Sequence, residues 1–128
     1  MSKRVISTSK APAAIGPYSQ AVSVSCGEAV YISGQIPLDP VTMKIVGETA
    51  AEQAIQVFKN IQAILDSAGL EKSHVVKTTI LLQSMDDFAS VNEEYGKFFA
   101  EPYPARAAFA VAKLPKDALI EIEAIAMK

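Results

Sequence analysis

An arginine and two glutamates near the C-terminus are the residues of this sequence best suited to bind and transform a small molecule. Arg106 opens an apolar stretch directly after Pro104 and Ala105, and Glu121 and Glu123 alternate with apolar residues in the next such stretch. A guanidinium is always charged, and its planar fork matches a carboxylate through two parallel hydrogen bonds. At the start of an apolar run, Arg106 is expected to be partly desolvated and to require an anion, such as a small carboxylated substrate.

The alternation of residues in these two stretches predicts strands that each have one apolar side. The sides expected to face the helices carry Ala107, Phe109 and Val111 on the first strand, and Ile120, Ile122, Ala124 and Ala126 on the second. The opposite face is then expected to carry Arg106, Ala108 and Ala110 together with Glu121, Glu123 and Ile125. Alanines among charges are typical of a face that a neighbouring chain covers. An ordinary ion pair between Arg106 and Glu121 or Glu123 explains the same pattern equally well.

Other arrangements of reactive residues find little support in the sequence. His74 stands at a predicted loop-to-strand junction where nothing marks a nucleophile for a Ser-His-Asp triad, and it is interpreted as a surface or strand-edge residue. Cys26, the only cysteine, lies beside Gly27 in a predicted hairpin turn and is interpreted as a bystander thiol. One histidine and one cysteine cannot form a structural zinc site, and the chain has no glycine-rich phosphate loop. No cofactor or metal is therefore expected.

The composition predicts a protein that associates with copies of itself. Of the 128 residues 50% are hydrophobic, and the mean hydropathy is +0.22. No apolar run approaches the roughly 20 residues of a membrane-spanning helix, so a partner subunit is expected to cover the apolar surface. The net charge of −2 gives no general attraction to nucleic acid or anionic lipid. Residues 1–7 lack an apolar signal core, and we expect a cytoplasmic protein, with a mitochondrial location left open.

Six stretches have the composition or the alternation of strands. They comprise residues 3–7, 22–25, 30–33, 75–83, 106–113 and 119–127. The second and third are expected to pair as a hairpin around Gly27 and Glu28, and the last two as another hairpin around residues 114–117. Because a slip of one residue would turn charges into the core, the facing of the last two strands is expected to be well determined.

Two further stretches have the apolar spacing of amphipathic helices. Thr49 and Glu52 fit a capping box ahead of a helix over residues 50–68, and Gly69 is well placed to end it. A second helix is expected to begin at residues 84–87 and to end at the prolines that follow. The order β-β-β-α-β-α-β-β predicts an α+β fold. Two helices are too few to cover both faces, so they are expected to pack on one face of a mixed sheet.

Several short motifs, spread in order over nearly the whole chain, resemble those of the Rid family. Residues 11–20 read APAAIGPYSQ, residues 33–37 read SGQIP, and residues 104–108 read PARAA, followed by LPK at 114–116 and IEIEA at 120–124. Residues 76–79 and 87–95 also fit the family pattern. The sequence departs from many bacterial members at Ala108, where they carry cysteine.

The resemblance implies a single Rid-type (endoribonuclease L-PSP-like) domain over residues 1–128, with a chorismate-mutase-like fold and a homotrimeric barrel assembly. It implies hydrolysis of 2-iminobutanoate and 2-iminopropanoate to 2-keto acids and ammonia, without a cofactor, in clefts between adjacent subunits. By resemblance, Arg106 grips the substrate carboxylate, Glu121 positions or activates water, and Tyr18 closes the pocket. The residues that match positions lining the cleft are Tyr18, Ser33, Gly34, Asn92 and Phe88.

Three other functions compete with imine hydrolysis. Some relatives have been described as RNA-cleaving translation inhibitors, but the net charge of −2 and the lack of a basic stripe with stacking aromatics disfavour a nucleic-acid partner. The apolar composition is the argument for a holdase-type chaperone. A catalytically silent ligand-binding relative would be expected to lose Arg106 or Glu121, and this sequence has both.

Overall fold

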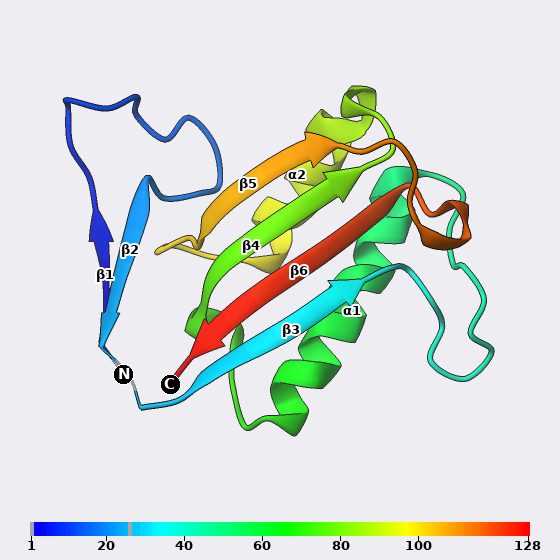
Figure 1. Ribbon diagram of the computed structural model, residues 1–128, viewed down its shortest axis with the longest axis horizontal. Helices are drawn as coiled ribbons and strands as arrows, with labels where there is room; N and C mark the ends of the chain where they lie inside the picture. Colours follow the sequence, from blue (N-terminus) through cyan, green and yellow to red (C-terminus); the bar gives the residue numbers. More distant parts are fainter. Residues whose placement is uncertain (1, 26) are drawn as a thin grey trace.

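The computed structural model describes residues 2–25 and 27–128 (Figure 1). The strands are β1 (Ser2–Ile6), β2 (Ala21–Ser25), β3 (Ala29–Gln35), β4 (Val75–Leu82), β5 (Ala105–Ala110) and β6 (Ile120–Met127). The helices are α1 (Ala50–Ser67) and α2 (Phe88–Phe98), with short 3-10 turns at Lys72–His74, Met85–Asp87 and Pro115–Asp117. This order of strands and helices is the predicted one. Cys26, predicted to lie in a hairpin turn, is outside the described residues.

Four strands form the main sheet in the order β3-β6-β4-β5, and two helices pack on one face of it (Figure 1). β4 and β5 are parallel because α2 carries the chain back between them, as parallel neighbours require. β6 pairs antiparallel with both β3 and β4. The predicted hairpin of the last two strands is therefore wrong. The connection after β5 crosses the end of β4, and β6 enters between β4 and β3.

β1 and β2 form a separate antiparallel ribbon beside the main sheet (Figure 1). The predicted hairpin of residues 22–25 with 30–33 is wrong, because β2 pairs with β1 and β3 pairs with β6. The ammonium of Lys3 ties the ribbon to the body of the fold. It donates to the backbone carbonyls of Ser73, Val75 and Pro102 at 3.4, 3.0 and 2.9 Å.

The helix over residues 50–68 is confirmed to within one residue. The Thr49 hydroxyl accepts a hydrogen bond from the Glu52 amide at 3.2 Å, as an N-cap does. The Glu52 carboxylate returns to the amide of Glu48 rather than to that of Thr49. Gly69 follows the helix with a φ of +71°, a conformation that favours glycine.

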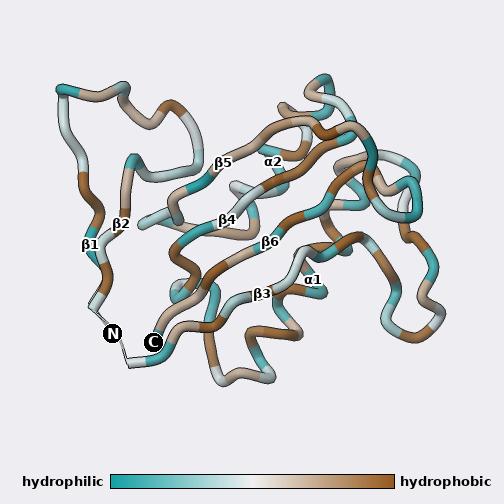
Figure 2. Tube along the Cα trace, in the orientation of Figure 1, coloured by the Kyte–Doolittle hydropathy of each residue, from teal (hydrophilic) through white to brown (hydrophobic). Residues whose placement is uncertain are grey.

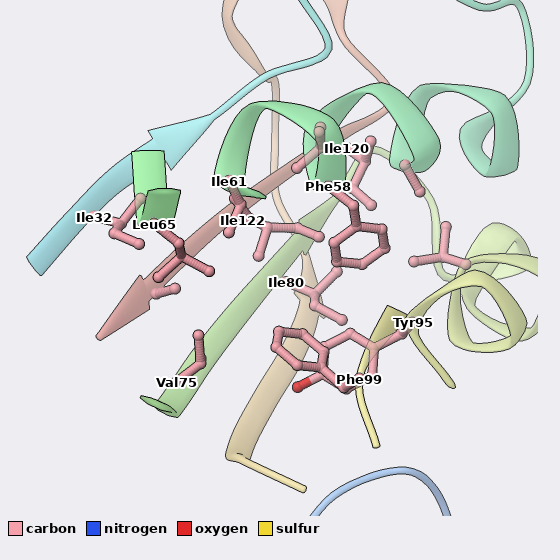
Figure 3. Packing of buried hydrophobic residues seen from close by; sticks show 14 of the residues in the cluster. Ile32, Phe58, Ile61, Leu65, Val75, Ile80, Tyr95, Phe99, Ile120 and Ile122 are labelled. Atoms are coloured by element: carbon pink, nitrogen blue, oxygen red, sulfur yellow. The ribbon is translucent and has the colours of Figure 1, made fainter. Parts of the chain in front are cut away.

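The apolar faces of the helices meet the apolar side of the sheet in one continuous core. Figure 3 shows the rings of Phe58, Tyr95 and Phe99 from the helical side lying next to Ile80 and Ile122 of the central strands. All of these side chains except Phe58 and Phe99 are fully buried, and those two are 4% exposed. The helices and the sheet therefore hold one another in place, because neither can bury its apolar face alone.

The predicted facing of β6 is confirmed. Ile120, Ile122, Ala124 and Ala126 are buried against the helices, and Glu121, Glu123 and Ile125 lie on the helix-free face.

The predicted facing of β5 is wrong. Arg106 pairs with Thr78 and Ala108 with Ile80, both of which point to the helices, so Ala107 and Phe109 lie on the helix-free face. A short edge strand rich in alanine has a weak alternation, and its sequence does not specify which face is buried.

On the helix-free face of the sheet, large apolar side chains are exposed to solvent. Tyr31 is 74% exposed and Phe109 is 47% exposed. Figure 2 shows hydrophobic residues along much of β4 and β6, interrupted by hydrophilic ones. Neither α1 nor α2, in the part of the chain that is described, has the length and apolar content that crossing a bilayer requires. The covering of this face by a second copy remains a prediction.

Candidate active site

Arg106 stands at the start of β5, on the helix side of the sheet, and its guanidinium is surrounded by aromatic rings. The guanidinium carbon is 4.9 Å from the ring centroid of Tyr95, 5.1 Å from that of Tyr18 and 5.4 Å from that of Phe88. One nitrogen, Nη1, donates to Oδ1 of Asn92 at 2.6 Å. Four of the predicted site residues, Tyr18, Phe88, Asn92 and Arg106, thus lie together.

No carboxylate neutralises this guanidinium among the described residues, where the ion pairs are Lys97 with Glu94 and Lys113 with Asp117. Burial is the main cause that lowers the pKa of Arg106, and the nearby phenols act in the opposite direction. An arginine still stays protonated at any physiological pH. The site therefore holds a partly desolvated positive charge with hydrogen-bond donors to spare, and a small carboxylate is the anion that this fork fits.

The ion pair of Arg106 with Glu121 or Glu123, one of the two explanations of the sequence pattern, is wrong for this chain. Arg106 faces the helices, whereas Glu121 and Glu123 project from the opposite face of the sheet.

Tyr95 is a part of this site that the sequence analysis missed. Its hydroxyl hydrogen-bonds to Oγ1 of Thr78 at 2.8 Å in the buried interior, and Thr78 is the β4 residue paired with Arg106. Its ring thus forms a floor under the guanidinium (Figure 3 shows Tyr95 within the core). In the sequence Tyr95 lies within the predicted second amphipathic helix, and no role in the site was predicted for it. The parallel pairing of β4 with β5, which links Thr78 to Arg106, was the missing information.

The loop before β2 places Tyr18 beside Arg106. The Ser19 amide donates to the carbonyl of Pro104 at 3.1 Å, and the Ser19 hydroxyl donates to the carbonyl of Tyr103. Ser19 thereby forms a parallel bridge with Ala105, the residue before the arginine. The contacts of Ser19 thus hold the neighbouring Tyr18 beside Arg106.

Ser33, Gly34 and Glu121 form a second group on the helix-free face. A Cβ added to Gly34 would lie 2.6 Å from Oε2 of Glu121 and 2.8 Å from its Cδ. The register of β3 against β6 shifts between Ile32 and Gln35, which is where Ser33 and Gly34 stand. Glycine at this irregularity leaves the room in which the Glu121 carboxylate lies across β3.

The predicted site residues therefore fall into two groups that one chain does not bring together. We call Arg106, Asn92, Tyr18 and Phe88 the arginine group, and Ser33, Gly34 and Glu121 the glutamate group. They lie on opposite faces of the main sheet, and the central strands separate them.

His74 does not join either group. Nδ1 of His74 accepts a hydrogen bond from the Glu71 amide at 2.9 Å, at the 3-10 turn before β4. Within residues 2–25 and 27–128, no three His, Cys, Asp or Glu side chains gather closely enough to hold a metal ion.

Comparison with known proteins shows the family to which the chain belongs. Residues 8–128 match the family model described as Endoribonuclease L-PSP. The crystal structure of RidA from the Antarctic bacterium Psychrobacter is 50% identical, covers 98% of this chain and 99% of its own, and has a TM-score of 0.77. The structure of E. coli TdcF with bound serine is 42% identical, covers 98% of both chains and has a TM-score of 0.73. The chain belongs to the endoribonuclease L-PSP family, also called the Rid family.

Curated relatives with about 50% sequence identity carry different names. The human 2-iminobutanoate/2-iminopropanoate deaminase is 53% identical over 126 residues, which are 98% of this chain and 90% of the human protein. A RutC family protein of Pyrococcus abyssi is 52% identical over 128 residues, which are 100% of this chain and 99% of that protein.

We predict that the ring of Tyr95, rather than its hydroxyl, supports carboxylate binding by Arg106. Tyr95→Leu should weaken binding of a small 2-keto acid about tenfold, because a cation–π contact in a partly desolvated site contributes about 1–2 kcal/mol. Tyr95→Phe keeps the ring and should bind within about twofold of the unchanged protein. Calorimetric titration with pyruvate measures both. Equal weakening in the two variants would contradict the role of the ring.

The burial of the Tyr95 phenol predicts that the folded protein loses stability at alkaline pH. Burial, the largest cause, raises the pKa of Tyr95 from 10.0 to about 12. Below pH 10 the Tyr95 phenol is neutral in both the folded and the unfolded state, so its ionisation does not lower the free energy of unfolding. Between pH 10 and 12 the unfolded chain ionises first, which should remove about 2–3 kcal/mol of unfolding free energy. Denaturant titrations at pH 9, 10 and 11 should show a shallower decline for Tyr95→Phe, and identical declines would contradict this assignment.

Proposed function

We propose that this protein hydrolyses small 2-imino acids to 2-keto acids and ammonia, at sites shared between the subunits of a homotrimer. The observation that carries the proposal is the guanidinium of Arg106, which is partly buried and hydrogen-bonded to an amide, with no carboxylate partner in the described chain. The human relative named 2-iminobutanoate/2-iminopropanoate deaminase, at 53% identity, supports the substrate class.

A 2-imino acid carries a carboxylate next to an electrophilic carbon that is double-bonded to nitrogen. In the proposed reaction Arg106 pairs with the carboxylate through two hydrogen bonds and so fixes the position of that carbon. Asn92 holds the guanidinium from one side, and Phe88 and Tyr18 limit the space around the substrate. The Tyr18 hydroxyl is proposed to donate a hydrogen bond to the bound substrate.

Glu121 is proposed to handle the protons of the reaction. As the water oxygen bonds to the carbon, Glu121 accepts a proton from the water and passes it to the imine nitrogen, which gives a carbinolamine. Glu121 then carries the proton of the carbinolamine hydroxyl to the nitrogen as the C=O bond forms, the carbon–nitrogen bond breaks and ammonia leaves. Gly34, which lies beside Glu121, and its sequence neighbour Ser33 are proposed to line the same cleft. Positioning and proton transfer are sufficient for an imine that already hydrolyses in water, so the proposal requires no metal or cofactor.

The separation of the two groups within one chain supports an assembly in which adjacent subunits complete each site. In a cyclic trimer each subunit can offer its arginine group to one neighbour and its glutamate group to the other, which yields three equivalent sites. The exposed Tyr31 and Phe109 on the helix-free face support the same assembly, because a copy of the chain would cover them. We propose that the trimer acts in the cytoplasm. Each of its subunits is proposed to be a single domain of residues 1–128.

RNA cleavage is the second candidate function, because the matching family model is described as Endoribonuclease L-PSP. The net charge of −2 argues against RNA cleavage, since non-specific RNA binding requires an excess of basic residues that contact the phosphates.

The direct test is imine hydrolysis in a coupled assay, with a threonine dehydratase generating 2-iminobutanoate. The unchanged protein should accelerate release of the 2-keto acid. Arg106→Ala should lower the rate of imine hydrolysis about a hundredfold, because it removes charge-assisted hydrogen bonds to the substrate that contribute about 2–3 kcal/mol. Arg4→Ala is the matched control, because Arg4 is the only other arginine and lies exposed in β1. Glu121→Gln should lower kcat more than it raises KM.

Two outcomes would contradict the proposal. If the folded protein fails to accelerate hydrolysis of any of several 2-imino acids, the deaminase function is wrong. If Arg106→Ala turns over as fast as Arg4→Ala, the arginine group is not the substrate site.

A further inference from the structure

A groove with an aromatic floor lies between α1 and α2, away from both groups of the proposed active site. It has a volume of 420 Å³, within the range of about 300–1,000 Å³ that small-molecule sites occupy. α1 contributes Ile55, Phe58 and Lys59, which stand on one side of that helix, and α2 contributes Phe98. Asn92 and Tyr95, which serve Arg106, do not line this groove.

The floor of the groove is apolar and aromatic. The rings of Phe58 and Phe98 are stacked, with centroids 4.6 Å apart and planes inclined by 16°. Ile55 is 43% exposed beside them. An exposed apolar side chain next to aromatic rings offers a surface on which a hydrocarbon body can pack.

The rim of the groove carries an excess of positive charge. Lys59, Lys72 and Lys97 line it together with one acidic residue, Glu94. Glu94 is already paired with Lys97 at 3.2 Å. The ammonium of Lys72 lies 4.5 Å from the centroid of the Phe98 ring, and no ion pair involves Lys59 or Lys72 in residues 2–25 and 27–128. Two lysines beside an apolar floor therefore lack an anionic partner.

We propose that this groove is a binding site for a small aryl carboxylate. The aryl ring packs on Ile55 and Phe98, and the carboxylate pairs with Lys59 and Lys72. The aromatic lining favours an aryl ring, and the two lysines without an ion-pair partner favour a single anionic group. This site is separate from Arg106, because its charged residues lie on the solvent side of the helices, whereas Arg106 lies between α2 and the sheet.

The fluorescent probe 2-naphthoate tests the proposal. The chain contains no tryptophan, so the anisotropy of the naphthoate emission can be followed without a protein indole background. All titrations use the Arg106→Ala protein, which removes the other carboxylate site. That protein should still bind 2-naphthoate. Adding Lys59→Gln and Lys72→Gln together should weaken binding about tenfold, since each exposed ion pair contributes up to about 1 kcal/mol.

Two controls separate the groove from general charge effects. The pair Lys44→Gln and Lys113→Gln removes the same charge outside the groove and should leave the affinity unchanged. The neutral analogue 2-naphthalenemethanol should bind less tightly than 2-naphthoate and should not respond to the groove lysines. The proposal is overturned if the Arg106→Ala protein does not bind 2-naphthoate. It is also overturned if the two lysine pairs have equal effects.

Discussion

The charge of Arg106, held by aromatic rings and an amide instead of a carboxylate, is the constraint on which the rest of this structure depends. A guanidinium that is partly withdrawn from water needs compensation, and a carboxylate would supply it at the cost of neutralising the charge. Here the rings of Tyr18, Phe88 and Tyr95 and the Asn92 carbonyl oxygen surround it. The charge is stabilised without being cancelled, and it remains available to an anionic ligand.

The fold supplies these neighbours from three separate parts of the chain. The β4-α2-β5 unit brings one face of α2 over the start of β5, and the hydrogen bond of Thr78 to Tyr95 joins the sheet to that helix. Ser19 fastens the loop that carries Tyr18 to the backbone just before Arg106. The same sheet places Glu121 on its other face. Within one chain, Arg106 is therefore kept apart from Glu121, the proposed proton carrier. In our proposal, association of subunits reunites the two.

The sequence predicted best what is encoded locally. A capping threonine, an apolar repeat and a terminal glycine were sufficient for α1, and strong alternation of isoleucine with glutamate was sufficient for β6. Strand pairing is a non-local property, and both predicted hairpins were wrong because β3 and β5 found partners distant in sequence. The orientation of β5 failed for another reason. Its alanines suit either face, and only the parallel register with β4 turns Arg106 toward the helices.

The family motifs identified most residues of the candidate site but not their distribution. All seven predicted site residues lie in one of the two groups, yet the sequence pattern placed Arg106 and Glu121 on a common face. Tyr95 was missed, because a tyrosine in an apolar helical repeat looks like an ordinary core residue until its partner on β4 is known.

The most direct test of the central claim, that Arg106 of one subunit works with Glu121 of the next, is complementation between two inactive variants. Arg106→Ala and Glu121→Gln proteins are mixed in equal amounts, unfolded and refolded together, and native mass spectrometry verifies that mixed trimers form. If each site takes its arginine and its glutamate from different subunits, random mixing leaves about a quarter of the sites intact and should restore about a quarter of the wild-type rate. If mixed trimers form and activity does not rise above that of the separate variants, both residues act within one subunit and the account is wrong.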